Sequence, residues 1–274
     1  MKISVRLKEN TLWANKGHEI AWSQFKIPWD VPPEPLVDVE KIPELNRQDI
    51  GDRVRFYGKN FDAVFSKTAG TIVTLKYRGR TIIQESRENI NGPLLEVFRA
   101  PTDNNRYLAK SWYRAGLNHL KHKHIVKNFE VKKISNKVYS VSVLTVSTGN
   151  DTSGFEQYST YRIFGNGAIL VKNDIKPFGN LPILPKIGVR ITLPGDFERF
   201  YWYGRGPIEN YPDRKEGAAI GVYRSTVTKQ YVPYVRPQET GNKEDVRWLA
   251  LLDKHGKGLL IIAGKPFSVT ALHY

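Results

Sequence analysis

The sequence predicts an all-β fold, and three observations support this prediction. More than a dozen short segments alternate apolar and polar residues with a period of two, which is typical of half-buried strands. Turn residues such as Gly, Asn and Asp separate these segments, and only residues 107–122 have the apolar spacing of a helix. With 274 residues, 40% of them apolar, the chain can bury a sizeable core. We therefore expect a large antiparallel sandwich or barrel, not a parallel βαβ fold.

The first 27 residues are expected to form a hairpin that needs a partner sheet. Residues 2–8 and 19–26 alternate in polarity, and a turn is predicted around Gly17. A two-stranded hairpin alone is only marginally stable in water. A stiff, extended linker is predicted over residues 28–48, which contain Pro28, Pro32, Pro33, Pro35 and Pro43. The domain boundary is placed in this linker.

Residues 49–274 are expected to form the main domain, beginning with an antiparallel meander. Its predicted strands cover residues 53–57, 61–66, 70–77 and 80–84. The helix over 107–122 is expected to break at Gly116. Further strands are predicted at 129–134, 138–146, 157–164, 168–175, 187–193, 218–223, 246–252 and 258–263. The tripeptide 165–167, Gly-Asn-Gly, predicts a hairpin turn. Residues 269–274 stop within a strand pattern, so the domain is expected to be truncated at its C-terminus.

Residues 202–214 predict a rigid polar loop at the centre of the domain. Gly204 and Gly206 are expected to adopt backbone angles that a Cβ would forbid, while Pro207 and Pro212 fix φ. A nucleotide-binding role is excluded, because the third glycine of that motif is missing. Four polar residues remain to bind neighbouring strands or a ligand, and both roles stay open: Glu209, Asn210, Asp213 and Arg214.

Composition excludes several classes of function. The formal net charge is +15, but the basic residues are spread along predicted strands, so no nucleic-acid partner is expected. Cysteine is absent, which excludes disulfides, thiolate metal sites and thiol nucleophiles. No apolar run approaches the roughly 20 residues of a bilayer span, so no membrane partner is expected. The chain is predicted to be soluble, and the cytoplasm and the periplasm of a bacterium stay open.

Candidate groups for catalysis or metal binding are few. Six carboxylates lie beside turn residues, where they are expected to cap or to pair with arginines: Asp103, Glu209, Asp213, Glu239, Glu244 and Asp245. His119, His122 and His124 resemble a metal cluster, but the lysines between them would repel a cation. No metal site is therefore predicted. Residues 98–105 and 231–242 set aromatic side chains beside amides and carboxylates, which suits either sugar binding or strand crossings.

Three of these loops, residues 98–104, 202–214 and 234–242, resemble in order and spacing the C-terminal small-chain domain of glycoside hydrolase family 2 β-galactosidases. Residues 12–22 resemble the last strands of the immunoglobulin-like domain that precedes it. The resemblance implies a galactose-mutarotase-like β-supersandwich after a fragment of an immunoglobulin-like sandwich. It places Arg99, Asp103 and Asn104 on the substrate rim. Glu209, Asn210, Asp213 and Arg214 match the family's most recognisable loop, as carbohydrate-facing residues or a structural hub.

The same resemblance implies that the chain has no catalytic residues of its own. In the family, the two catalytic glutamates lie on a separate (β/α) barrel, and Mg and Na ions are often used there. The expected partners are the remainder of the parent chain and a galactoside, and the parent enzyme can be a homo-oligomer. The sequence departs from the family pattern in two places. The loop after Asn104 leads quickly to Trp112, and the tryptophan that the family supplies to the galactoside pocket comes from a segment beyond the position of Tyr274. A stand-alone carbohydrate-binding module and an aldose-epimerase-like enzyme are the alternatives.

Overall fold

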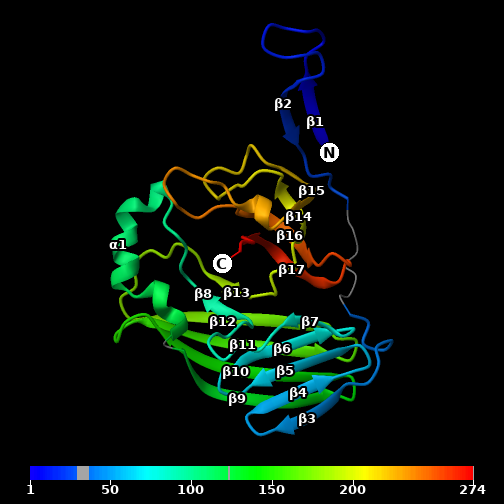
Figure 1. Ribbon diagram of the computed structural model, residues 1–274, viewed down its shortest axis with the longest axis vertical. Helices are drawn as coiled ribbons and strands as arrows, with labels where there is room; N and C mark the ends of the chain where they lie inside the picture. The colour runs from blue at the N-terminus through cyan, green and yellow to red at the C-terminus, as the bar shows by residue number, and fades with distance from the viewer. Residues whose placement is uncertain (30–36, 123, 274) are drawn as a thin grey trace.

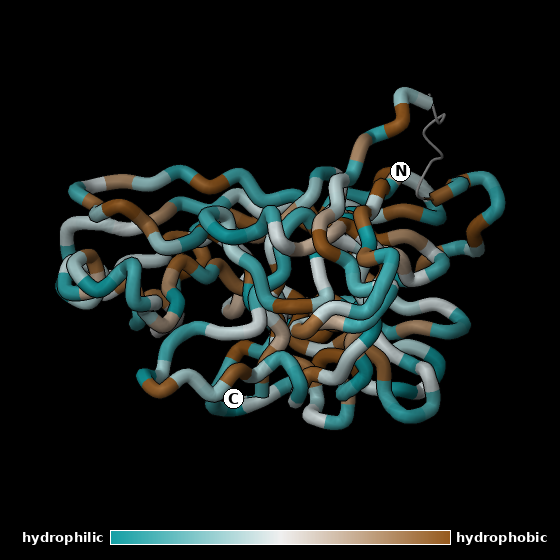
Figure 2. The backbone as a smooth tube through the Cα atoms, turned by 90° about the horizontal axis from the view of Figure 1, so that it is seen from above, coloured by the Kyte–Doolittle hydropathy of each residue, from teal (hydrophilic) through white to brown (hydrophobic). Residues whose placement is uncertain are grey.

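The computed structural model describes residues 1–29, 37–122 and 124–273. Within them the chain forms seventeen strands and one short α-helix, which confirms the all-β prediction. All strand pairings are antiparallel. Figure 1 shows two packed regions, with the N-terminal hairpin projecting from the upper one. Hydrophilic and hydrophobic residues alternate along much of the backbone in Figure 2, which is the pattern that predicted the strands.

The predicted N-terminal hairpin is confirmed, with β1 (Lys2–Arg6) paired to β2 (Glu19–Gln24). Its strands are largely exposed on both faces. The side chain of Gln24 attaches the hairpin to the main domain: its Nε2 donates to the Ile220 carbonyl at 2.8 Å, and the Ile220 N–H donates to its Oε1 at 2.7 Å. Residues 30–36, which hold three of the five linker prolines, lie outside the described residues.

Two sheets pack face to face in the lower region of Figure 1. One contains β3 (Asn46–Ile50), β4 (Arg53–Tyr57), β5 (Phe61–Ser66), β6 (Thr71–Tyr77) and β7 (Arg80–Ile83), paired in sequence order. The other contains β9 (His124–Ser135), β10 (Val138–Thr148), β11 (Gly154–Phe164) and β12 (Ile169–Phe178). Their inward side chains form one core, in which the Phe65 and Tyr161 rings meet edge to face at 5.2 Å. The meander and the 165–167 turn are confirmed, and β3 begins within the range expected for the linker.

The upper region contains a second four-stranded sheet in the order β15-β14-β16-β17. Its strands are β14 (Arg199–Gly206), β15 (Ala219–Thr226), β16 (Lys243–Leu252) and β17 (Gly258–Val269). Its inner face buries Phe200, Trp202 and Leu249. Two predictions are corrected: β17 ends at Val269, so residues 270–273 do not continue a strand, and the strand expected at 187–193 is only β13 (Gly188–Arg190), which pairs with β8 (Leu94–Glu96).

The helical segment is confirmed together with its break. It comprises η1 (Asp103–Asn105), α1 (Arg106–Arg114) and η2 (Leu117–His122), and a further turn, η3 (Thr228–Gln230), precedes β16. Trp112 anchors α1, because it is buried and its Nε1 donates to the Ile183 carbonyl at 2.8 Å. Gly116 separates α1 from η2 with a φ of +67°, which favours glycine.

Gly116→Ala is expected to lower the free energy of unfolding by about 2 kcal/mol. A Cβ at this position would lie 1.9 Å from the Gly149 carbonyl oxygen, so the backbone would have to move. Gly256→Ala is the matched control, since Gly256 also has a positive φ but open space around it. Urea denaturation of both variants separates the steric cost from the cost of φ, and equal losses would contradict the steric argument.

Candidate functional site at a three-loop junction

Three loops that lie far apart in the sequence meet beside the upper sheet. We call this region the three-loop junction; it consists of residues 98–105, 207–214 and 231–242. The Asp103 N–H donates to Gln238 Oε1 at 3.0 Å, and Asn104 Nδ2 donates to Asp213 Oδ2 at 3.0 Å. Arg99 Nη1 forms an ion pair with Glu239 Oε2 at 3.2 Å. The first loop is thus bound by both of the others.

Glu209 is the central acceptor of the junction. Its largely buried carboxylate accepts hydrogen bonds from Arg214, from the Tyr234 hydroxyl and, at 2.8 Å, from the Gly241 N–H. Its hydrogen bond with the Tyr234 hydroxyl raises the pKa of Tyr234. Three donors from two segments therefore converge on one carboxylate, which fixes the second and third loops relative to each other.

Asn210 lies fully buried and holds the second loop to β16. Its Oδ1 accepts from the Glu244 N–H at 2.8 Å, and its Nδ2 donates to the Ile208 carbonyl at 2.9 Å. Its backbone N–H and carbonyl both bond to Asn242, each at 2.8 Å. Because every polar group of Asn210 has a protein partner, the structure places this residue in the framework under the junction surface.

Asp103, Asn104, Asp213 and Arg214 lie at the exposed surface of the junction, whereas Arg99 is mostly covered. Arg99 Nη2 donates to Asn105 Oδ1 at 3.0 Å, so it supports the turn that carries Asp103 and Asn104. Asp103 also forms a 3.1 Å ion pair with Arg106. The exposed amide, carboxylates and guanidinium of these four residues could hydrogen-bond a polar ligand.

Tyr211 is a junction residue that sequence reasoning missed. Its buried ring lies 5.7 Å from the Arg99 guanidinium and 5.4 Å from that of Arg214. Burial, together with the nearby Glu239 and Glu209 carboxylates, raises the pKa of its hydroxyl. The contact of its ring with two arginines could have identified Tyr211, but Arg99 lies far from it in the sequence, so this contact becomes visible only in the folded structure.

The prediction that residues 202–214 form a loop is wrong for its first half, because Trp202 to Gly206 lie in β14. The predicted reason for its glycines is also corrected, since neither Gly204 nor Gly206 has a positive φ. A Cβ on Gly204 would lie 2.8 Å from Val246 Cα, and one on Gly206 would lie 2.7 Å from the Tyr223 ring. Glycine is required here for close packing.

The remaining candidate carboxylates are also engaged by protein groups. Glu244 Oε1 accepts from Asn242 Nδ2 and from Ser268 Oγ, each at 2.7 Å, and Asp245 pairs with Arg205 at 2.6 Å. Among residues 1–29, 37–122 and 124–273, no group of three His, Asp or Glu side chains could hold a metal ion. His124 is partly buried between Ser147 Oγ and the Ala69 carbonyl, each at 3.1 Å. Burial lowers the pKa of His124. The His122 side chain lies outside the described residues.

Glu209→Gln is expected to lower the free energy of unfolding by about 2 kcal/mol, because an amide cannot replace a carboxylate that accepts from Arg214 and Tyr234. The pKa of Tyr234 should fall at the same time, which a difference absorbance titration of tyrosinate would detect. Glu216→Gln is the control, since Glu216 is exposed and its ion pair with Arg205 is long, at 3.4 Å. Equal effects of the two substitutions would contradict the central role of Glu209.

Comparison with known proteins decides the family. A family model described as β-galactosidase small chain matches residues 57–274. The chain belongs to the β-galactosidase small-chain family. A second model, described as β-galactosidase domain 4, matches residues 1–28 and so covers the N-terminal hairpin. All three loops of the junction lie within the small-chain match.

Curated β-galactosidases are similar over most or all of the chain. The enzyme of Priestia megaterium is 32% identical over the whole chain, and that of Lactobacillus delbrueckii is 33% identical over the whole chain. The Kluyveromyces lactis enzyme is 32% identical over 96% of the chain. The chain spans about a quarter of the length of these relatives, 25%, 26% and 25% respectively. Among the described helices of this small-chain protein, none is long and apolar enough to cross a bilayer.

Proposed function

We propose that this chain acts as the non-catalytic small-chain domain of a β-galactosidase, packs against a catalytic barrel and contributes the turn at residues 103–105 to the rim of a β-galactoside site. The three-loop junction is the observation that carries the proposal. It holds an exposed turn in place with bonds from two other loops. A preorganised surface of this kind favours binding, because little conformational freedom is lost when a ligand arrives.

Each rim residue has a distinct role in this proposal. Asp103 and Asn104 offer exposed polar groups to sugar hydroxyls, whereas Arg99 and Asp213 act as positioning residues for the turn. Cleavage requires two carboxylates flanking the scissile bond. In this proposal those carboxylates, and the Mg and Na ions that the parent family often uses, belong to the rest of the enzyme.

Complementation tests the proposed role. The Priestia megaterium β-galactosidase, shortened to lack the quarter that this chain matches, is mixed with the purified chain and assayed on a chromogenic β-galactoside. Recovery of activity is expected. Asn104→Ala and Asp213→Ala should raise KM about fivefold, which corresponds to roughly 1 kcal/mol for one hydrogen bond. Asp174→Ala, on the distant strand β12, is the control and should leave KM unchanged.

The chain assayed alone tests the claim that catalysis lies elsewhere. No turnover above a heat-treated sample is expected, and measurable turnover would contradict the claim. Heat released on titration with millimolar galactose would favour a stand-alone carbohydrate-binding module. Accelerated mutarotation of α-galactose, followed by polarimetry, would favour an aldose epimerase.

A further inference from the structure

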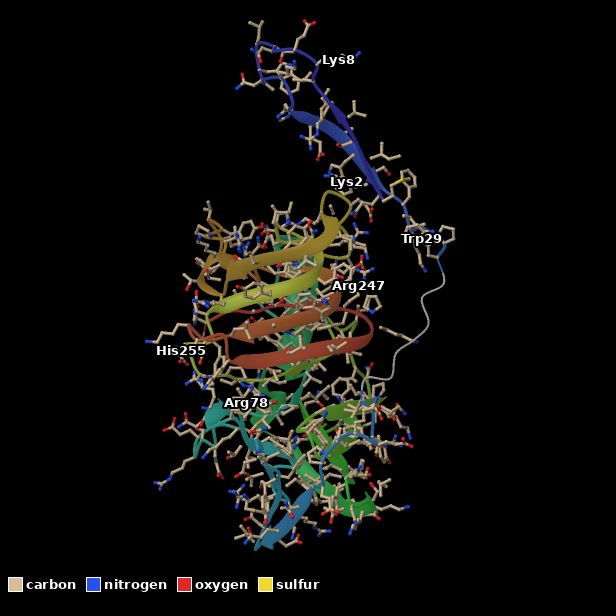
Figure 3. The ribbon with its side chains drawn as sticks, turned by 90° about the vertical axis from the view of Figure 1, so that its right-hand side faces the viewer. Lys2, Lys8, Trp29, Arg78, Arg247 and His255 are labelled. Carbon is tan, nitrogen blue, oxygen red and sulfur yellow. The ribbon has the colours of Figure 1, made fainter. Side chains whose placement is uncertain are left out.

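The outer face of the upper sheet carries an uninterrupted row of apolar side chains. Cross-strand pairing places Val222 opposite Tyr203, Tyr203 opposite Trp248, and Trp248 opposite Ile262. We call these four residues the apolar row. Val222 is 65% exposed, Ile262 53% and Tyr203 37%, because the other face of the sheet is the one that packs into the core. The row therefore crosses all four strands on the solvent side. Figure 3 looks onto these four strands.

The other four-stranded sheet shows what a solvated outer face of this protein looks like. There one row consists of Glu130, Ser142, Thr160 and Lys172, again one residue from each strand, and the exposed apolar residues Tyr158 and Leu170 lie opposite the charged Asp174 and Arg162. Both sheets bury their opposite faces in hydrophobic cores. Each sheet thus has one buried and one outer face. Because the outer face of the upper sheet is more apolar than that of the other sheet, we infer that another protein surface covers it.

The N-terminal hairpin reaches the same sheet at its β15 edge. Gln24 bonds to both backbone groups of Ile220, two residues before Val222. Figure 3 shows the hairpin above β15. The hairpin matches β-galactosidase domain 4, and its own apolar side chains Ile3 and Val5 are exposed. The contact between hairpin and sheet is thus an interface to another β-galactosidase domain, and the apolar row continues from it.

We propose that the apolar row docks the larger part of a β-galactosidase, the three quarters that this chain does not span. The inference rests on the proposed function, because it assumes that such a partner exists. Two arginines accompany the row: the Arg247 guanidinium lies over the Tyr203 ring, 5.4 Å from its centroid, and Arg224 is exposed on β15. Arginine is enriched in protein interfaces. Because the row extends across all four strands of the sheet, its partner is expected to be a protein surface.

Binding of the shortened Priestia megaterium enzyme to the chain tests the proposal. The double substitution Val222→Lys and Ile262→Lys should raise Kd at least about tenfold, because it places two charges in a buried interface. Thr160→Lys, on the outer face of the sheet that contains β9 to β12, is the control and should bind like the wild type. Both changed positions of the double variant are exposed, so the chain is expected to fold, which circular dichroism verifies. Unchanged Kd in the double variant, or no binding by the wild type, would overturn the proposal.

A second measurement does not depend on a separate fragment. The chain is fused in place of the matching quarter of the intact Priestia megaterium enzyme, and hydroxyl-radical labelling of Tyr203 and Trp248 is compared with that in the free chain. Labelling should fall severalfold on fusion, and unchanged labelling would overturn the proposal. A free chain that is dimeric in sedimentation, and monomeric after Ile262→Lys, would instead assign the row to a second copy.

These readouts separate the docking surface from the proposed rim role. If the chain binds through the apolar row but restores no activity, the rim role fails and the docking surface stands. If activity is restored equally by the wild type and the double variant, with equal Kd, the docking surface fails and the rim role stands.

Discussion

Trp202→Ala is expected to lower the free energy of unfolding by about 4 kcal/mol, which is typical of removing a large buried aromatic side chain. Trp202 is 1% exposed, stacks on Phe200 with 4.8 Å between ring centroids, and donates from Nε1 to the Arg205 carbonyl at 2.9 Å. The substitution leaves a cavity in the core of the upper sheet and an acceptor without its donor.

Urea denaturation followed by circular dichroism measures this loss. Tyr203→Ala is the matched control, because Tyr203 is the next residue of β14 and points to the opposite, exposed face. Its truncation should cost less than about 1 kcal/mol. If both variants lost the same free energy, the assignment of the inner face as the core of this sheet would be contradicted.

Lys243→Met is expected to raise the free energy of unfolding by about 2 kcal/mol at pH 7. Lys243 is 1% exposed, and burial lowers its pKa from 10.5 to about 8, against the opposing effect of Glu209. A depression of this size corresponds to roughly 3 kcal/mol against the charged form at neutral pH. Methionine also loses the 3.0 Å hydrogen bond from Lys243 Nζ to the Gly241 carbonyl, which costs about 1 kcal/mol. The net gain in stability is therefore about 2 kcal/mol.

The sign of the pH dependence follows from the same pKa. Between pH 8 and 10.5 the unfolded chain holds a proton on Lys243 that the folded chain has released. This residue's contribution to stability should therefore rise with pH across that window and stay constant below it. Denaturation of wild type and Lys243→Met at pH 7 and pH 10.5 checks this, with exposed Lys265→Met as control. An advantage for Met that does not shrink at the higher pH would contradict the argument.

Much of the fold could be predicted from the sequence, because a strand with one buried face has apolar and polar residues in alternation. The strands that were not predicted lack this alternation. β3 is exposed along its whole length and polar except for Ile50, and β8 has only three residues. The wrong assignment of Trp202 to Gly206 has another cause, since glycines that permit close packing look the same in a sequence as glycines that permit a turn.

The candidate site could be predicted only in part. Its loops are recognisable by composition and by resemblance, but the bond between Asn104 and Asp213 joins residues 109 positions apart, and no local pattern encodes it. Lys243 shows a second limit. Lysine in an alternating strand normally marks the solvent face, whereas here it points inward beneath Trp202, with its Nζ 5.3 Å from that ring. Its energetic role therefore became visible only in three dimensions.

The bidentate contact between Gln24 and Ile220 joins the N-terminal hairpin to the edge of the upper sheet. One side-chain amide supplies the donor and acceptor that a neighbouring strand would otherwise supply, so the hairpin is attached to β15 as a single rung of a ladder. The two residues are 196 positions apart. The contact thus holds the end of β2 at the edge of β15 through hydrogen bonds between two positions that lie far apart in the sequence.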